Sequence, residues 1–427
     1  MTWTNWAGNQ TMSPALVARP TSRDEVAAAV KRAAADNQRV KPIGSGHSFT
    51  AIGLTDGVQL DLTGLAGPVR VSGTRVTADA GLPLYRLNAE LATHGLGLTN
   101  MGDVDRQTVS GAISTGTHGT GRDSAGLAAQ VVELELVLAD GSIVPCSSSE
   151  RPEVFEMARL GLGALGVLTT VTFQAEPAYL LQADERPMPL DDVLDGFEDL
   201  TTANEHFEFF WFPHTDVALT KRNNRVDTPA PLGRVRNAVE DELFGNLVFQ
   251  LTCQLGRAVP SLIPRINRGV AQGMSARTYA DAAPRVYVSS RRVRFREMEY
   301  AIPRQALPTL VGELRRLTER LDMKISFPVE VRVAPADDVP MSSAYGRDSA
   351  YVAVHVVKGT DPTVYFREAE ALFGAVGGRP HWGKLHTLGV EQLRERYPRF
   401  DDFVALRDAL DPERRFGNTY LQRVLGS

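Results

Sequence analysis

The stretch that most constrains this chain is a short loop with two glycines at residues 41–50, which read Lys-Pro-Ile-Gly-Ser-Gly-His-Ser-Phe-Thr. Gly44 and Gly46 allow positive φ angles, so successive N–H groups can turn toward one side. A concave run of N–H groups is suited to binding a phosphate, and the neighbouring serines add hydroxyl donors. Phosphate binding alone does not explain His47. A solvated glycine-rich turn is the alternative that the loop by itself leaves open.

A second unusual stretch, residues 102–121, consists mostly of glycines, hydroxyl residues and other small side chains, with His118 between Thr117 and Gly119. Side chains this small cannot build a core of their own, but they let a large group lie close to the backbone. A long flexible loop is the alternative. Loops of this length inside compact domains usually have a function, which favours a ligand-binding role.

Composition places the chain among ordinary globular proteins. It has 427 residues, of which 43% are hydrophobic and 23% charged, so we expect about two or three domains with a large core. The net charge of −5 does not suggest a nucleic-acid-binding protein. The arginine-rich residues 291–296 alternate with apolar side chains, which favours a half-exposed strand over a nucleic-acid patch.

Two cysteines, Cys146 and Cys253, lie far apart without a CxxC motif, so the sequence predicts neither a zinc site nor a disulfide framework. The first residues lack the basic and apolar regions of a signal peptide. No apolar stretch approaches the roughly 18 residues of a membrane span. We therefore expect a cytoplasmic protein with no membrane span and no metal.

Periodicity predicts an α+β region up to about residue 176. Helices are expected at residues 21–30, 84–94 and 152–160, and strands at 57–62, 69–71, 74–78, 131–138, 143–146 and 167–173. Thr21 or Ser22 can cap the first helix, and Glu25 can close a capping box with Ser22. From about residue 178 to 380, aromatic strands such as 206–213 alternate with long helices such as 305–321, which indicates a second domain.

Residues 161–166 formally match the GxGxxG pattern of dinucleotide-binding proteins. The match follows an expected helix and precedes an expected strand, whereas a Rossmann fingerprint follows a strand and opens a helix. The sequence therefore favours a tight helix-to-strand connection that touches a ligand.

Three places in the second half carry candidate chemistry. Glu330 and Arg332 are two residues apart in the expected strand 326–333, so they share a face and can hold a polar ligand together. A cross-strand ion pair is the alternative. His355, in the expected strand 351–357, is either structural or catalytic. Lys384 follows His381, a tryptophan and a glycine, which favours a fixed positive charge beside a ligand over a surface turn.

Four of these motifs, in this order, resemble the vanillyl-alcohol-oxidase type of FAD flavoproteins, with a PCMH-type FAD-binding domain. They are the 44–48 loop, the 111–121 segment ending Thr-His-Gly-Thr-Gly, the Gly163–Gly166 turn and the His381–Lys384 segment. Within that group the chain resembles the aldonolactone oxidoreductases, including L-gulono-1,4-lactone and D-arabinono-1,4-lactone oxidases. Alditol oxidases are close to these. The resemblance runs through nearly the whole chain.

The resemblance implies an α+β fold, with a two-subdomain FAD-binding domain at 1–176 and a substrate or cap domain at 177–380. The cap would carry an antiparallel sheet flanked by helices, and residues 381–427 would return to the FAD domain. His47 would attach covalently to the flavin. Residues implied in cofactor binding are Ile43, Gly44, Ser45, Gly46, His47, Ser48, Ser110, Gly111, Ser114, Thr117, His118, Gly119, Gly121, Gly163, Gly166, Val167 and His381.

The implied reaction is the oxidation of a CH–OH group by hydride transfer to flavin N5, with oxygen or another acceptor reoxidising the flavin. Glu330 and Arg332 would hold the substrate hydroxyls, and Lys384 would stabilise the charge of reduced flavin. His355 would bind a hydroxyl or accept its proton. L-gulono-1,4-lactone is the first expected substrate, then an alditol or another sugar alcohol group such as a nucleoside 5′-hydroxyl. A non-catalytic flavin-binding protein is the alternative of another class.

Overall fold

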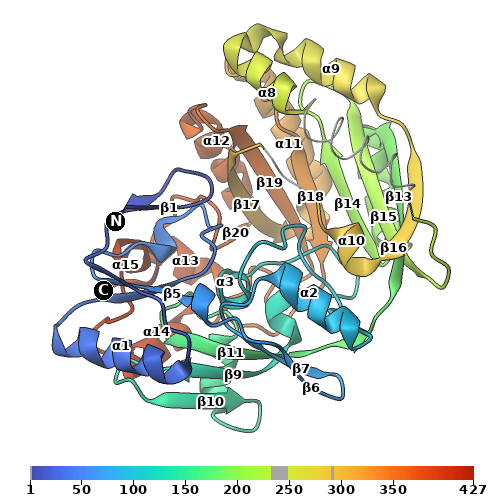
Figure 1. The fold of residues 1–427 in the computed structure, drawn as a ribbon. Coiled ribbons are helices and arrows are strands. Elements are labelled where there is room, and N and C mark those ends of the chain that lie inside the picture. The colour runs from blue at the N-terminus through green and yellow to red at the C-terminus, as the bar shows by residue number, and fades with distance from the viewer. Residues whose placement is uncertain (1, 232–248, 290–292) are drawn as a thin grey trace.

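The computed structural model describes residues 2–231, 249–289 and 293–427 of the chain. Figure 1 shows two units, with an eight-stranded sheet standing over a unit built from both ends of the chain. Among the described residues, no helix combines the length and hydrophobicity needed to cross a bilayer.

The first unit contains two main sheets around one core. A three-stranded parallel sheet has the order β3-β5-β4, and a five-stranded antiparallel sheet has the order β10-β9-β11-β7-β6. The strands are β3 (Leu16–Ala18), β4 (Val40–Ile43), β5 (Val58–Asp61), β6 (Arg70–Ser72), β7 (Arg75–Asp79), β9 (Val131–Val137), β10 (Ile143–Ser147) and β11 (Val167–Gln174). Two small antiparallel pairs join β1 (Trp3–Thr4) to β2 (Thr11–Met12) and β8 (Leu96–Gly97) to β12 (Glu176–Pro177).

The three helices expected in the first unit are present, but the first of them continues to Ala35, beyond its expected end at residue 30. The helices of this unit are α1 (Arg23–Ala35), α2 (Leu84–Thr93), α3 (Val109–Thr115) and α4 (Pro152–Ala158). Ser22 caps α1 by accepting the Glu25 N–H, as expected, but the Glu25 carboxylate accepts the Thr21 N–H rather than closing the box with Ser22. Helix α3 was not predicted, because it lies inside the small-residue stretch 102–121.

The chain end folds back onto this unit. Helices α13 (Val390–Arg396), α14 (Phe400–Leu410) and α15 (Thr419–Leu425) contribute Leu393, Phe403 and Val424 to the same hydrophobic core. The Asn418 amide donates hydrogen bonds to the carbonyls of Ala51, Ile52 and Leu54, which joins the last helix to the loop after β4.

The second unit is an antiparallel sheet with the order β16-β13-β15-β14-β18-β19-β17-β20. Its strands are β13 (Leu180–Pro189), β14 (His206–Trp211), β15 (Val217–Val226), β16 (Arg277–Ala282), β17 (Phe295–Pro303), β18 (Val329–Ala334), β19 (Ser349–Val357) and β20 (Arg379–Pro380). Its helices are α5 (Leu190–Asp195), α6 (Phe197–Thr202), α8 (Phe249–Ala258), α9 (Ile263–Gly273), α10 (Ala283–Tyr287), α11 (Leu307–Arg320) and α12 (Thr363–Ala375). The expected strand 291–296 begins in residues outside those described, and β17 starts at Phe295.

The two faces of the central strands differ in chemistry, because successive strand residues point to opposite sides. Met298, Val331 and Val354 pack with the apolar side chains of α11 and α12 in one hydrophobic core. The alternate residues of the same strands, including Glu297 and Glu330, are buried but lie outside that core. One face of the sheet thus forms the core of the second unit, and the other gathers polar side chains.

Candidate active site

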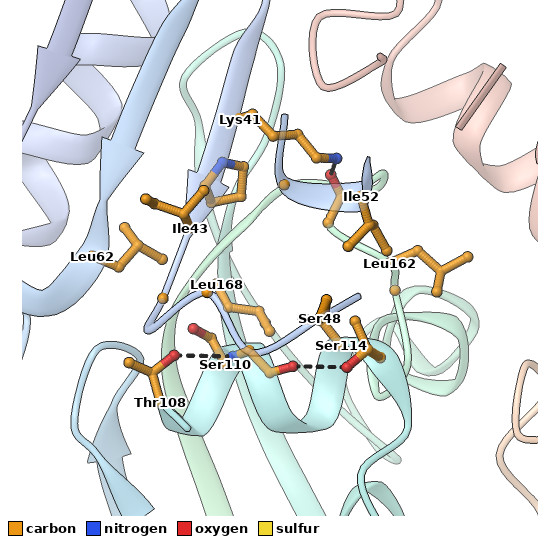
Figure 2. Close-up of a pocket in the computed structure, with 18 of the residues that line it drawn as sticks. Lys41, Ile43, Ser48, Ile52, Leu62, Thr108, Ser110, Ser114, Leu162 and Leu168 are labelled. Atoms are coloured by element: carbon orange, nitrogen blue, oxygen red, sulfur yellow. Dashed lines mark hydrogen bonds between the residues drawn. The ribbon is translucent and has the colours of Figure 1, made fainter. Parts of the chain in front are cut away.

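The loop of residues 43–48, helix α3 and the turn before β11 enclose a cavity in the first unit (Figure 2). The space free of atoms amounts to about 990 Å³, part of it open to solvent. Many of the residues predicted to bind the cofactor line it: Ile43, Gly44, Ser45, Gly46, His47, Ser48, Ser110, Gly111, Ser114, Gly163 and Gly166. Three stretches that are far apart in the sequence therefore meet around one cavity.

The glycines of the loop are required by its geometry. Gly46 has φ of +69°, in the left-handed region that favours glycine. A Cβ atom on Gly44 would lie 1.9 Å from the Thr108 hydroxyl oxygen. The backbone of this loop therefore approaches the start of α3 more closely than any side chain would allow.

Helix α3 forms where the sequence indicates only a loop rich in small residues. Thr108 caps it by accepting the Gly111 N–H, and Gly116 ends it with φ of +85°. Val109 and Ile113 are buried in the core of the first unit, so tertiary packing outweighs the weak helix propensity of the segment. The cap threonine and the terminal glycine are the local signals that could have revealed this helix.

The turn at residues 161–166 connects α4 to β11, as predicted, and Gly163 has φ of +59°. Lys41 was not singled out from the sequence, although it is buried in the same wall (Figure 2). Its ammonium donates to the carbonyls of Gly163, at 3.0 Å, and Phe416, at 3.1 Å. Burial lowers the pKa of Lys41 to about 7, although Asp411 acts in the opposite direction. Lys41 thus ties the turn to the chain end.

The remaining predicted cofactor residues do not line this cavity. Val167 is buried at the start of β11, and Gly121 donates its N–H to the carbonyl of Val333 in the second unit. The others are Thr117, His118, Gly119 and His381. His118 and His381 lie instead against the polar face of the large sheet, where Glu299 is their neighbour.

Arg332 is the centre of a buried ion-pair network on that face. Its guanidinium pairs with Glu330 on the same strand, with Glu208 on β14 at 3.0 Å and with Asp103 of the first unit at 3.2 Å. The structure therefore contains both the pair expected within one strand and the cross-strand ion pair that was its alternative.

Lys384 and His355 both lie beside Glu297. The Lys384 ammonium forms an ion pair with one Glu297 oxygen, and His355 Nε2 lies 3.4 Å from the other. Burial by itself would raise the pKa of Glu297, but Lys384 and His355 outweigh it and lower that pKa to about 2. Burial would lower the pKa of Lys384, but Glu297 and Glu299 outweigh it and raise that pKa. A charged pair therefore persists on this face.

A second carboxylate of β17, Glu299, accepts a hydrogen bond of 2.7 Å from His118 Nε2. His118 Nδ1 donates to the Gly119 carbonyl, and the ring stacks on Tyr351 at 3.5 Å between centroids. His381 accepts the Gly383 N–H at Nδ1, and burial lowers its pKa to about 4. Side chains of metal-binding type thus meet here, with both ring nitrogens of His118 and Nδ1 of His381 engaged in hydrogen bonds.

The polar face and the cavity are joined at His47. The Phe49 N–H donates to the Gly383 carbonyl at 2.7 Å, and the Lys384 ammonium lies 5.4 Å from the Phe49 ring centre. Burial, assisted by the nearby Lys384 charge, lowers the pKa of His47 to about 4. The His47 imidazole is therefore neutral near pH 7, and its ring stacks against Trp6.

Sequence reasoning missed both carboxylates of β17. Glu297 and Glu299 alternate with Met298 and Tyr300, and both carboxylates are buried. The signal was a period-two pattern of acidic and apolar residues, which usually marks a solvated face. Only the pairing of Glu297 opposite His355 in the sheet shows what the pattern means here.

Comparison with known proteins identifies the class of protein to which this fold and site belong. Residues 14–147 match the family model described as an FAD binding domain, and residues 171–424 match that of D-arabinono-1,4-lactone oxidase. Fold and site together define an FAD-dependent oxidoreductase. The chain belongs to the D-arabinono-1,4-lactone oxidase family, which confirms the resemblance seen in its motifs.

Full-length relatives support the assignment. L-gulono-1,4-lactone dehydrogenase of Mycobacterium tuberculosis is 43% identical over 427 residues, 99% of either chain. Bovine L-gulonolactone oxidase is 34% identical over 98% of this chain and 97% of its own. Alditol oxidase of a Streptomyces species is 31% identical over 99% of this chain and 98% of its own.

A solved structure of cholesterol oxidase from B. sterolicum has the same fold, with a TM-score of 0.83 at 20% identity over 99% of this chain and 96% of that one. The likeness confirms the predicted α+β class, an FAD-binding domain with an antiparallel sheet over it.

The cavity itself fits the FAD group. Its wall offers hydroxyl groups and glycine backbone of the kind that bind a pyrophosphate, together with apolar surface from Ile52 and Leu168.

Gly44→Ala should prevent the loop from packing against α3, because the new Cβ atom would overlap the Thr108 hydroxyl. We expect the purified variant to lose most of its flavin, measured as the ratio of absorbance at the flavin band to that of protein. Gly312→Ala is the matched control, since nothing lies within 4 Å of a Cβ atom there. Wild-type flavin content in Gly44→Ala would contradict this account of the loop.

Proposed function

We propose that the protein oxidises a CH–OH group of an aldonolactone, with L-gulono-1,4-lactone as the first substrate and oxygen or another acceptor reoxidising the flavin. The observation that carries the proposal is the buried polar face, where Glu330, Arg332, His355 and Lys384 lie together beside the cofactor cavity. The relatives named for gulonolactone support this substrate. An alditol is the second candidate, favoured by the alditol oxidase relative.

When bound, FAD accepts the hydride of the substrate carbon at N5, and the protein orients and polarises the reactants. Glu330 and Arg332 offer an acceptor and donors to adjacent hydroxyl groups, and their mutual pairing fixes both side chains before substrate arrives. Lys384 supplies the positive charge that stabilises the anion of reduced flavin.

His355 takes the hydroxyl proton in this proposal. Its Nδ1 lies 3.2 Å from the carbonyl oxygen of Pro328. A carbonyl oxygen only accepts, so Nδ1 carries a hydrogen, and Nε2 is the ring nitrogen that would take the substrate proton. Nε2 faces Glu330 at 4.0 Å, on the side where the substrate hydroxyl would bind.

His47 would attach FAD covalently through the flavin 8α-methyl carbon. A neutral imidazole is a nucleophile, and the depressed pKa of His47 keeps the ring neutral at physiological pH. In the same assignment, residues 1–176 and 381–427 form the FAD-binding part, and residues 177–380 form the cap over the substrate.

His47→Ala should abolish covalent attachment without removing the loop backbone that holds the pyrophosphate. We expect acid precipitation of the wild-type holoenzyme to leave the yellow colour in the pellet, and that of the variant to release flavin into the supernatant. Ser45→Ala changes a neighbour of the ring and should leave the colour in the pellet. Release of flavin from the wild type would refute the attachment.

Glu330→Gln should reduce kcat/KM for the lactone by about 10- to 100-fold, the cost of one hydrogen bond to a charged group. The measurement is steady-state turnover of wild type and variant with L-gulono-1,4-lactone, an alditol such as xylitol, and a nucleoside. Glu313→Gln, on the outer helix α11, serves as the control and should retain full activity. A preference of the wild type for the alditol would replace the first substrate with the second.

A further inference from the structure

The Glu297 carboxylate lies between the two side chains that carry charge in the proposed reaction. One oxygen pairs with the Lys384 ammonium, and the other lies 3.4 Å from His355 Nε2. The Glu297 side chain is only 5% exposed, and it stands directly opposite His355 in the register of β17 and β19. The contact is therefore built into the sheet.

A proton arriving at His355 Nε2 would meet two carboxylates. Nε2 is the ring nitrogen left to take it, because Nδ1 donates to the Pro328 carbonyl. Glu297 lies 3.4 Å away and Glu330 lies 4.0 Å away. The carboxylate nearest to a proton held at Nε2 is therefore that of Glu297.

We propose that Glu297 is a positioning residue for the oxidation, an inference that rests on the proposed function. One of its oxygens holds Lys384 at the flavin-binding loop, and the other stabilises the proton that His355 receives. In the reaction, the substrate O–H bond breaks and its proton goes to His355 Nε2. The C–H bond breaks with its electron pair, which leaves as hydride for FAD. The alcohol carbon becomes a carbonyl and FAD is reduced, while Glu297 acts only through its two partners.

The surroundings of Glu297 keep it ionised for this role. Lys384 approaches from the segment after β20, and His355 from β19. The other titratable or charged groups around this pair are Glu330 and Arg332 on β18, Glu299 on β17, His118 and His381 beside it, and His47 across from Lys384. Glu330 pairs with Arg332, whereas Glu297 is the carboxylate that contacts both Lys384 and His355.

Glu297→Gln keeps the shape of the side chain and removes its charge. The measurement is the anaerobic rate of flavin reduction by L-gulono-1,4-lactone as a function of pH. The substitution removes a negative charge 3.4 Å from Nε2, so the acid limb of the profile should move to lower pH. The limiting rate should fall roughly tenfold or more, because the ring holds the proton less well. An acid limb at the wild-type pH would overturn the proposal.

Sulfite binding provides a second readout that needs no substrate. Sulfite adds to oxidised flavin and leaves negative charge on the ring, which a nearby cation stabilises. In Glu297→Gln, Lys384 loses the carboxylate with which it forms an ion pair, so sulfite should bind roughly fivefold or more tightly. Weaker or unchanged sulfite binding would overturn the link to Lys384. If the lactone does not reduce wild-type flavin, the proposed function fails, and the sulfite result still decides this link.

Two further variants separate this role from a merely structural one. Glu299→Gln removes an equally buried carboxylate of β17 that pairs with His118, and its acid limb should stay at the wild-type pH. Glu297→Asp keeps the charge on a shorter side chain, so the shift of the acid limb and the gain in sulfite affinity should be smaller and of the same sign. This variant replaces Glu297→Gln in the experiment if Glu297→Gln does not fold. An Asp variant with lower thermal stability but unchanged pH profile and sulfite affinity would show a structural role only.

Discussion

The site depends on the ion pair between Glu297 and Lys384, in which each buried charge compensates the other. An unpaired carboxylate in this position would cost several kcal/mol, and an unpaired ammonium would cost a similar amount. Together they allow a charged face to persist inside the protein, between the large sheet and the loop that carries His47. The hydrogen bond from the Phe49 N–H to the Gly383 carbonyl holds the loop and the Lys384 segment in contact. The cavity and the polar face thus lie together, built by two units.

The sheet makes this possible because its two faces are assigned to different tasks. The apolar face packs on α11 and α12 and provides the stability of the second unit, whereas the polar face is held by ion pairs across the four neighbouring strands β14, β18, β19 and β17. Arg332 extends the network to Asp103 of the first unit, so the position of the large sheet relative to the first unit is linked to the side chains that would hold substrate. Rigid strands also place catalytic groups more accurately than loops.

Much of the site could be predicted, because its signals are local. The tolerance of glycine for positive φ angles singled out the 43–48 loop. The period of two in a strand singled out the pair Glu330 and Arg332. Glu297 could not be found this way, since its meaning depends on a partner strand more than fifty residues later in the sequence. Helix α3 was missed for a related reason, because burial of Val109 and Ile113 stabilises a segment whose own propensity is weak.

The most direct test of the account is a single turnover without oxygen. Oxidised wild-type holoenzyme is mixed with excess L-gulono-1,4-lactone, and the absorbance of oxidised flavin is followed in a stopped-flow instrument. If the cavity and the charged face form one oxidising site, the flavin band should bleach completely, and faster than with an alditol. A flavin that stays oxidised with every lactone and alditol tested would contradict the central claim.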